Sequence, residues 1–165
     1  MKVGKEIALE AKKKGICKEW FSDMLKLNDV KPLCEMYFRG DDWAMENDFP
    51  DLSILRKFKG NSDKYGLHTD FEGEISNQHQ TALFGNSVGT LNYDGYFAGN
   101  LIVRHNSKAN IVVKDNAFLI VNILDNAEVR ITTYGNGKAI VYNYHSTSVV
   151  MFDGNVEVKQ ANFEK

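Results

Sequence analysis

The second half of the chain carries a ten-residue repeat, which limits the possible folds more strongly than any other feature of the sequence. From Phe97 onwards the repeat reads FAGNLIVRHN, SKANIVVKDN, AFLIVNILDN, AEVRITTYGN, GKAIVYNYHS and TSVVMFDGN. The third position of each block is small or aliphatic, the fifth is aliphatic or methionine, and the first four blocks end in asparagine. Apolar residues alternate within each block, as they do in a strand with one buried face. The repeat therefore predicts a series of short, regularly spaced strands.

Two architectures fit strands that recur at this interval. In an antiparallel meander each block pairs with the next, whereas in a β-solenoid two blocks form a coil of about 20 residues and each block stacks on the block two places later. Ile120 and Ile140 are apolar outward positions, whereas Asn110 and Arg130 in the intervening blocks are polar. Repeated asparagines also suit stacked turns, where side-chain amides form a ladder. We therefore favour a mainly β fold, a single-stranded β-helix (β-solenoid) of roughly four coils over residues 77–160.

The beginning of the chain differs in composition from the repeat and predicts a separate helical part. Charged side chains are much denser before the turn-rich stretch Gly60–Gly66 than after it. Apolar residues at helical spacing predict short helices over residues 3–14, 16–27, 29–39, 43–47 and 51–58. Asp29 and Asp51 are candidate N-caps. We expect residues 1–65 to form a helical cap and residues 66–165 to form the β-solenoid repeat domain.

Composition and charge exclude several classes of protein. The net charge is −2, which argues against a broad nucleic-acid surface. No apolar run approaches the ~20 residues of a membrane span, and Met1–Lys14 lacks the apolar core of a signal peptide. The two cysteines, Cys17 and Cys34, fit neither a metal spacing nor a disulfide framework. We therefore expect a cytoplasmic protein with reduced thiols, no membrane or nucleic-acid partner, no metal and no cofactor.

Four aliphatic residues fall on outward positions of the predicted coils: Ile102, Ile120, Leu124 and Ile140. Together with neighbouring tyrosines they make a face too apolar to be left in water. Either the helical cap packs on this face or a second subunit does, so these four residues are predicted to be interface or cap contacts. A short solenoid also has two ends whose strand edges must be covered. We expect the helices to cover one end or side, residues 160–165 to cover the other end, and the protein to be a homo-oligomer.

His105, Asp125 and His145 share the ninth position of alternate blocks. In a solenoid they form a column along one corner, called here the histidine column. Neighbours are then close enough to hydrogen-bond, whereas the two histidines lie ~9–10 Å apart, too far to share a metal ion. The functional interpretation is a ligand-binding column, and the structural alternative is a solvated row of turn residues with a local Asp–His pair. All three residues are retained as candidate binding residues.

Tyr134, Tyr142, Tyr144 and Phe152 are also predicted to point outward. Rows of exposed aromatic rings stack on sugars or anchor a protein partner. The alternative is that these rings pack beneath the helices or inside a dimer interface. The three tyrosines are retained as candidate binding residues.

No motif in the sequence assigns a reaction or a catalytic residue. A phosphate-binding glycine loop, a nucleophile elbow and an HExxH zinc motif are all missing. We therefore expect a non-enzymatic structural or interaction protein, whose rigid β-solenoid presents rows of side chains to a protein partner or to a second copy. The alternative is a carbohydrate-binding or carbohydrate-processing module of a bacterial or phage surface, which would use Tyr142, Tyr144 and the histidine column.

Four short segments resemble uncharacterised bacterial and prophage-encoded proteins in which helices precede a short β-helix. They are Leu33–Tyr37, Asn47–Pro50, Tyr93–Gly95 and Val103–His105. The resemblance implies the same order of helices and solenoid, and no assigned activity. In architecture the repeat is also similar to the bactofilins, cytoskeletal proteins that polymerise through stacked β-helices. Bactofilins carry disordered polar tails where this chain has an aromatic-rich helical segment, which implies that one end of the stack is blocked against open-ended polymerisation.

Overall fold

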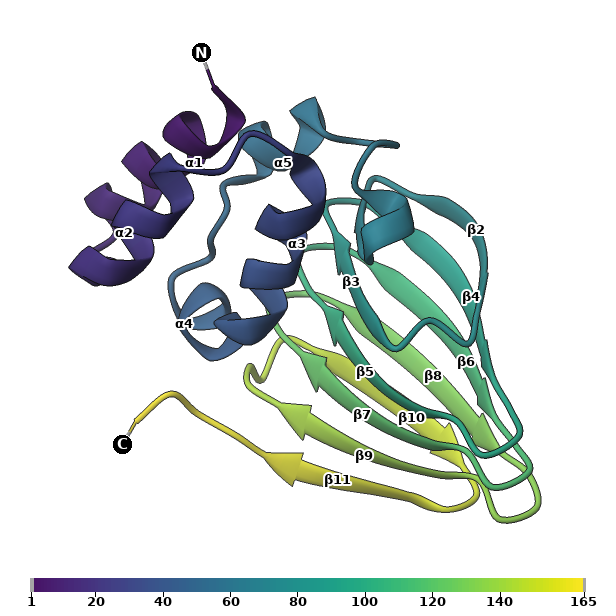
Figure 1. Cartoon of the computed structure of the whole chain (residues 1–165). Helices are drawn as coiled ribbons and strands as arrows, with labels where there is room; N and C mark the ends of the chain where they lie inside the picture. Colours follow the sequence, from purple (N-terminus) through teal and green to yellow (C-terminus); the bar gives the residue numbers. More distant parts are fainter. Residues whose placement is uncertain (1, 165) are drawn as a thin grey trace. The chain divides into compact units, whose positions relative to one another are not determined.

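The chain folds into two compact units, residues 1–65 and residues 66–165, in a computed structural model that describes residues 2–164 (Figure 1). Within the described residues, all the helices lie in the first unit and all the strands lie in the second. The boundary falls in the turn-rich stretch Gly60–Gly66. The helical sequence and the repeat sequence therefore occupy separate units.

The helical unit consists of α1 (Val3–Lys13), α2 (Lys18–Leu25), α3 (Val30–Arg39), α4 (Asp41–Glu46), α5 (Leu52–Lys57) and the 3₁₀ turn η1 (Asp63–Tyr65). The five short helices confirm the predicted helical N-terminal part. The predicted N-cap positions of Asp29 in α3 and Asp51 in α5 are confirmed, but neither side chain makes the capping hydrogen bond. Over residues 2–164, no helix is both long enough and apolar enough to cross a membrane.

Helices α1 and α2 pack closely because Gly4 has no side chain. Its amide N–H donates to the Leu27 carbonyl oxygen at 3.1 Å, and a Cβ atom at this position would lie 2.1 Å from the Met24 carbonyl oxygen. Ile7 and Ala11, one helical turn apart, are buried on the same face of α1. A larger residue at position 4 would push the two helices apart.

The Lys14 side chain holds the loop between α4 and α5 on the end of α1. Its ammonium group donates to the carbonyl oxygens of Asn47 (3.1 Å) and Asp48 (2.7 Å). It also donates to Asp51 Oδ1 at 2.7 Å, and the Asp51 amide N–H donates to Glu10 Oε1 at 2.5 Å. Burial raises the pKa of the Glu10 carboxyl above its ordinary value. This network joins α1 to a distant loop through a lysine that is itself half-buried.

The β-solenoid unit consists of β1 (Leu67–Thr69), β2 (Glu72–Ser76), β3 (Gln80–Phe84), β4 (Val88–Tyr93), β5 (Ala98–Val103), β6 (Lys108–Val113), β7 (Phe118–Ile123), β8 (Glu128–Thr133), β9 (Lys138–Asn143), β10 (Val149–Asp153) and β11 (Val156–Gln160). The odd-numbered strands form one sheet and the even-numbered strands form a second, called here the odd sheet and the even sheet (Figure 1). Each strand pairs in parallel with the strand two places along the chain. The predicted β-solenoid of about four coils is therefore confirmed, and the antiparallel meander is excluded.

Each coil in the middle of the solenoid is made of two blocks of the repeat, since Leu101 pairs with Val121 and Val121 pairs with Val141. Side chains at alternate positions point into the space between the two sheets and form one continuous core. Most of them have no exposed surface, as expected for parallel sheets that are covered on this side. Tyr93 is part of this core, and burial raises the pKa of its phenol.

The turns between strands repeat a left-handed backbone conformation at their second residue. These residues are Gly85, Gly95, His105, Asp115, Asp125 and Gly135, with φ between 58° and 70°. Glycine adopts this conformation freely, and Asn, Asp and His adopt it more often than other side chains. A hydrogen bond closes the turn at His105, from the Ser107 amide N–H to the Arg104 carbonyl oxygen at 3.2 Å. The sequence repeat is therefore in large part a repeat of this turn.

The turn between β9 and β10 is one residue longer than the turns of the middle coils and changes the alternation in the last strand of the even sheet. Paired residues in β8 and β10 are therefore one residue further apart in the sequence than paired residues in the middle coils. As a result Met151 pairs with the outward-facing Arg130 and points outward. Phe152 pairs with the inward-facing Ile131 and points inward. The prediction that Phe152 points outward is therefore wrong, because a strict count in blocks of ten does not register the inserted residue.

Candidate functional site

The histidine column lies at the corner where the odd strands turn into the even strands, and its side chains bond to backbone amides. The amide N–H of Gly85 donates to His105 Nδ1 at 2.9 Å. The amide N–H of His105 donates to Asp125 Oδ2 at 2.9 Å, and that of Asp125 donates to His145 Nδ1 at 2.7 Å. Each side chain of the column therefore holds the turn of the preceding coil.

These contacts determine which ring nitrogen carries the proton. A backbone N–H can only donate, so Nδ1 of His105 and of His145 accepts, and the ring proton of each neutral imidazole is on Nε2. His145 Nδ1 lies 3.7 Å from Asp125 Oδ1, whereas in a catalytic dyad that nitrogen donates its proton to the carboxylate. Asp125 Oδ2 also accepts a hydrogen bond from the buried Arg104 side chain, whose Nε is 3.1 Å away. The geometry ties turns together and does not form an acid–base pair.

The opposite corner of the coil uses the same arrangement without histidine. The amide N–H of Gly95 donates to Asp115 Oδ2 at 2.9 Å. Asn136 Nδ2 donates to Asn116 Oδ1 at 3.0 Å, which is one step of the amide ladder expected from the repeated asparagines. Side chains that bond to the preceding coil are therefore a general property of the repeat. This observation favours the structural interpretation of the histidine column.

In the described part of the chain, the cysteines and acidic residues could serve as metal ligands or nucleophiles only where their grouping and burial allow it. Within residues 2–164, no three His, Cys, Asp or Glu side chains are grouped so that they could hold a metal ion. Cys17 is exposed and Cys34 is buried, both as free thiols. Burial raises the pKa of the Cys34 thiol to about 12, so this thiol stays protonated and unreactive at neutral pH.

The three candidate tyrosines have different surroundings. Tyr134 is 58% exposed, at the start of a turn. Tyr142 and Tyr144 are half-buried, and the Tyr144 ring stacks on Phe163 with ring centroids 4.5 Å apart. Tyr96 is 91% exposed at the same corner as Tyr134, and the sequence could have indicated it because a tyrosine there replaces the repeated asparagine. The two rings on which the carbohydrate hypothesis depends, Tyr142 and Tyr144, are therefore less accessible to a sugar than Tyr134.

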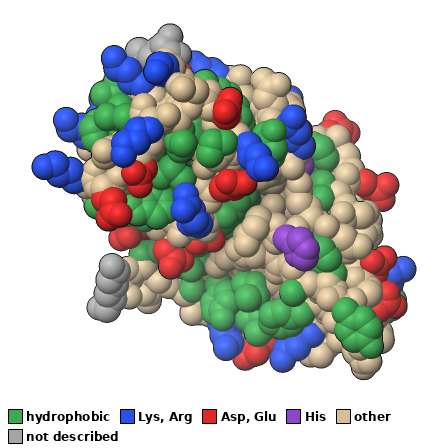
Figure 2. Space-filling model, viewed as in Figure 1, with side chains coloured by type: hydrophobic (Ala, Val, Ile, Leu, Met, Phe, Trp, Pro, Cys, Tyr) green, Lys and Arg blue, Asp and Glu red, His purple; other side chains and the backbone are tan. Residues whose placement is uncertain are grey.

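The four aliphatic candidates lie along the outer side of the odd sheet and at its corner. Ile102 and Leu124 have no exposed surface, whereas Ile120 and Ile140 are only partly buried. Exposure increases toward the last strands, and Figure 2 shows hydrophobic side chains gathered over the part of the odd sheet that Figure 1 labels β7 and β9. The accessible part of this apolar face is therefore the part nearest the last coil.

The last coil of the solenoid combines exposed apolar side chains with unpaired strand edges. The exposed apolar residues are Val149, Met151, Phe152 and Val158, at 41%, 43%, 51% and 37%. Strands β10 and β11 end the even sheet and the odd sheet, and within residues 2–164 no strand pairs with their outer edges. Free amide and carbonyl groups on such edges accept another strand readily. We call these two strands the last-coil edge; the sequence predicted that an end needed covering but not which residues form it.

Residues 160–165 were expected to cover this end of the solenoid. Lys165 lies outside the described residues. The Ala161 amide N–H donates to the Asn143 carbonyl oxygen at 2.9 Å, and Phe163 packs on Tyr144. Strands β10 and β11 nevertheless remain exposed, so the described part of this tail leaves the last-coil edge open and the expectation is wrong for residues 160–164.

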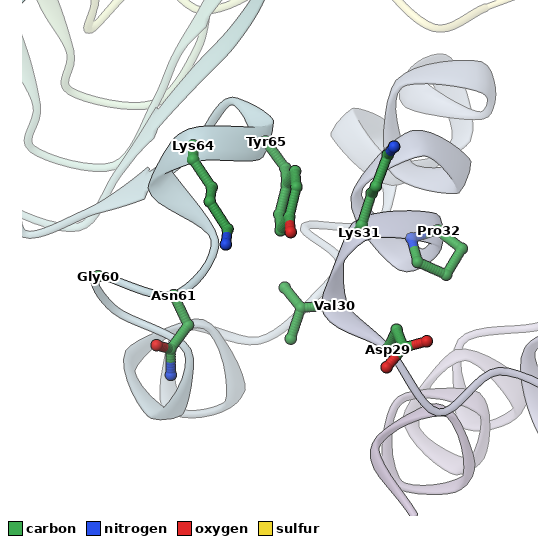
Figure 3. A pocket seen from close by; sticks show the side chains of 8 residues that line it. All are labelled: Asp29, Val30, Lys31, Pro32, Gly60, Asn61, Lys64 and Tyr65. Carbon is green, nitrogen blue, oxygen red and sulfur yellow. The ribbon is translucent and has the colours of Figure 1, made fainter.

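The helical unit contains a shallow depression of about 510 Å³ between the start of α3 and the segment around η1 (Figure 3). Figure 3 shows the side chains of Val30, Lys64 and Tyr65 pointing toward its centre. The Lys64 ammonium group lies 5.0 Å from the centroid of the Tyr65 ring. Its charged and amide side chains are exposed and Tyr65 is half-buried, so no fully buried polar side chain lines the depression.

Comparison with known proteins adds no assignment. No protein-family model, curated protein or solved structure matches the chain.

Proposed function

We propose that this chain is a non-enzymatic interaction protein that presents the last-coil edge of a rigid β-solenoid to a protein partner. The observation that carries the proposal is the occurrence of exposed apolar side chains and unpaired strand edges on the same coil. Recognition by strand addition uses both features. Main-chain hydrogen bonds supply affinity, and side chains at alternate positions supply specificity.

The composition of β10 supports this assignment. Four of its five residues, Val149–Phe152, are apolar, and only Asp153 at its end is charged. Natural edge strands are usually protected from association by charges, by proline or by a bulge. An edge strand that lacks this protection is suited to pair with another chain.

The rest of the solenoid supports the edge mechanically. Inward side chains fill the space between the sheets, and the side chains of both corners bond to the preceding coil. Strands held in this way lose little further conformational freedom when a partner strand is added. The same hydrogen bonds account for the histidine column without any catalytic role, which favours binding over chemistry.

Position-specific photo-cross-linking tests the proposal in cells that produce the full chain. A photoreactive amino acid is placed at Met151 and, as the matched control, at Thr90. Both positions belong to one outward row of the even sheet that runs through Asn110 and Arg130, and Thr90 is also exposed. The two positions therefore share strand geometry and exposure but lie on different coils.

We expect abundant protein adducts at position 151 and few at position 90. The mass of each adduct reports whether the partner is a second copy or another protein. Absence of adducts at position 151, or equal amounts at the two positions, would overturn the assignment of the last-coil edge as the interaction surface.

A further inference from the structure

We propose that the partner of the last-coil edge is a second copy of this chain, added as antiparallel strands about a two-fold axis through Met151 and Val158. The inference rests on the proposed function, because it names the occupant of the same surface. Three properties of β10 and β11 carry it: the direction of their free backbone groups, the position of their centres and the placement of their charges.

The free backbone groups of β10 belong to its second and fourth residues. The Val149 amide N–H donates to the Ala127 carbonyl oxygen at 3.0 Å, so Val149 turns its backbone groups toward β8. Successive residues of a strand turn their N–H and C=O groups to opposite sides. Met151 therefore also faces β8, whereas Val150 and Phe152 face the free edge.

The free backbone groups of β11 belong to its first, third and fifth residues. The Ala139 amide N–H donates to the Asn155 carbonyl oxygen at 3.1 Å, so Asn155 turns toward β9. The same alternation then turns Val156, Val158 and Gln160 toward the free edge.

Full antiparallel overlap uses these free groups in both strands. Two copies of β10 overlap over all five residues only when Met151 stands opposite Met151 of the second copy. Val150 then faces Phe152 of the second copy, and their edge-facing groups form both hydrogen bonds of a bonded pair. Two copies of β11 overlap fully when Val158 stands opposite Val158 of the second copy, and its edge-facing groups bond across the axis in the same way.

One axis passes through the centres of both strands. Val158 pairs with Val141, which pairs with Val121, and Met151 pairs with Arg130. Val121 and Arg130 are equally far along the chain from the turn that joins β7 to β8. Met151 and Val158 therefore lie at the same level along the strands, and a single axis normal to the two sheets serves both.

The charges of β11 are self-complementary about this axis. Glu157 and Lys159 both point outward from the odd sheet, and their charged groups lie 3.6 Å apart within one chain. In the two-fold arrangement Glu157 stands opposite Lys159 of the second copy, and Lys159 stands opposite Glu157 of the second copy. Opposite charges on facing positions stabilise an antiparallel pair, so the four charges alternate around the axis.

Closure by a two-fold axis is favoured over an open filament. Head-to-tail stacking would place the last coil of one copy on the first coil of the next, which requires both edges of the first coil to be free. Strand β1 at that end is buried at every residue, and β2 carries Glu72 and Glu74. The last-coil edge is therefore expected to pair with the last-coil edge of a second copy and not with the first coil.

Light scattering coupled to size-exclusion chromatography, over a wide range of concentrations of the full chain, tests the arrangement. We expect the unaltered chain to form a dimer as the concentration rises. Glu157→Lys and Lys159→Glu each create like charges on two facing pairs per dimer, and each is expected to weaken association about tenfold. A mixture of the two variants faces opposite charges again, so it is expected to form a heterodimer with close to the original affinity.

Glu74→Lys makes the same change of charge on the edge strand of the first coil and is expected to leave dimerisation unchanged. A monomer at every concentration, with cross-links from position 151 to other proteins, overturns self-association and leaves the proposed function standing. Filaments, or loss of association in Glu74→Lys, overturn the two-fold arrangement. A mixture that associates as weakly as the separate variants overturns the charge pairing.

Discussion

The first and last coils of the solenoid belong to the same two sheets but differ in the exposure of their edge strands. Strand β1 is buried at all three residues, whereas β10 and β11 are exposed along most of their length. Strand β2 is exposed but carries Glu72 and Glu74 on either side of Gly73. Like charges and a glycine make a poor edge for an added strand, so the first coil is protected and the last coil is open.

The same comparison shows where the chain departs from its repeat. The number of residues along the chain between two paired residues is smaller for β1 with β3 and for β2 with β4 than in the middle of the solenoid. It is larger by one residue for β8 with β10, and it is smaller again for β9 with β11. The strands between keep the regular register of two blocks. The repeat therefore builds the rigid middle, and the irregular ends determine which surface is available to a partner.

A buried charge gives the largest expected contrast between the middle and the last coil. Val121 and Val158 lie in one inward row, but Val121 has no exposed surface and Val158 is 37% exposed. Val121→Asp is expected to lower the free energy of unfolding by more than about 4 kcal/mol, because its carboxylate has no partner in the core. Val158→Asp is expected to cost less than about 1 kcal/mol, because water reaches the carboxylate.

Urea unfolding followed by circular dichroism measures both variants, at a concentration too low for association. Val121→Asn is the matched control, since it introduces a polar group of similar size without the charge. Equal losses for the two aspartate variants would show that the last coil is as well packed as the middle, and the comparison between them would fail.

The middle of the solenoid is predictable from the sequence because it depends on period alone. The aliphatic third and fifth positions are enough to place Leu101 and Val121 in the core. The last coil is not predictable in the same way, since the extra residue in the turn before β10 reverses the alternation of Met151 and Phe152. A one-residue shift moves every following side chain to the opposite face of the sheet, and composition does not reveal it.

The histidine column was identifiable by its spacing, but its chemical role was not. Residues with the ninth-position spacing do form a column of hydrogen bonds. The sequence could not reveal that the side-chain acceptors of the column face backbone amides of the preceding coil. This orientation depends on the left-handed turn at His105 and Asp125. The recurrence of Gly, Asp and His at one position was the available signal, since these residues share tolerance of positive φ.

The turns give an intermediate contrast between the middle and the last coil. Asp115 has a φ of 58° and accepts the Gly95 amide N–H, whereas His145 accepts the Asp125 amide N–H from a longer turn with an ordinary backbone. Asp115→Ala is expected to cost about 2 kcal/mol, through the lost hydrogen bond and the strain of alanine at positive φ. His145→Ala is expected to cost about 1 kcal/mol, through the hydrogen bond alone.

Asp115→Gly separates the two contributions to the first value. Glycine loses the same hydrogen bond but adopts the left-handed backbone without strain, so this variant is expected to cost about 1 kcal/mol, like His145→Ala. Thermal and urea unfolding give the free energies. If Asp115→Gly were as damaging as Asp115→Ala, backbone strain would not distinguish the turns of the middle from the last turn.

The smallest expected effect is an alkaline loss of stability that comes from the buried core of the early coils. Burial raises the pKa of Tyr93 above that of a tyrosine in the unfolded chain, about 10. As pH rises above that value the unfolded chain loses this proton first, so the free energy of unfolding falls by up to about 1.4 kcal/mol per pH unit. Tyr93→Phe lacks this proton, so its free energy of unfolding is expected to fall by about 1 kcal/mol less than that of the unaltered chain between about pH 9.5 and 11.

Tyr134→Phe, at a ring that is 58% exposed, is the control and should follow the unaltered chain. Parallel curves for the unaltered chain and Tyr93→Phe in urea unfolding across this pH range would show that the early core admits water as readily as the last coil does.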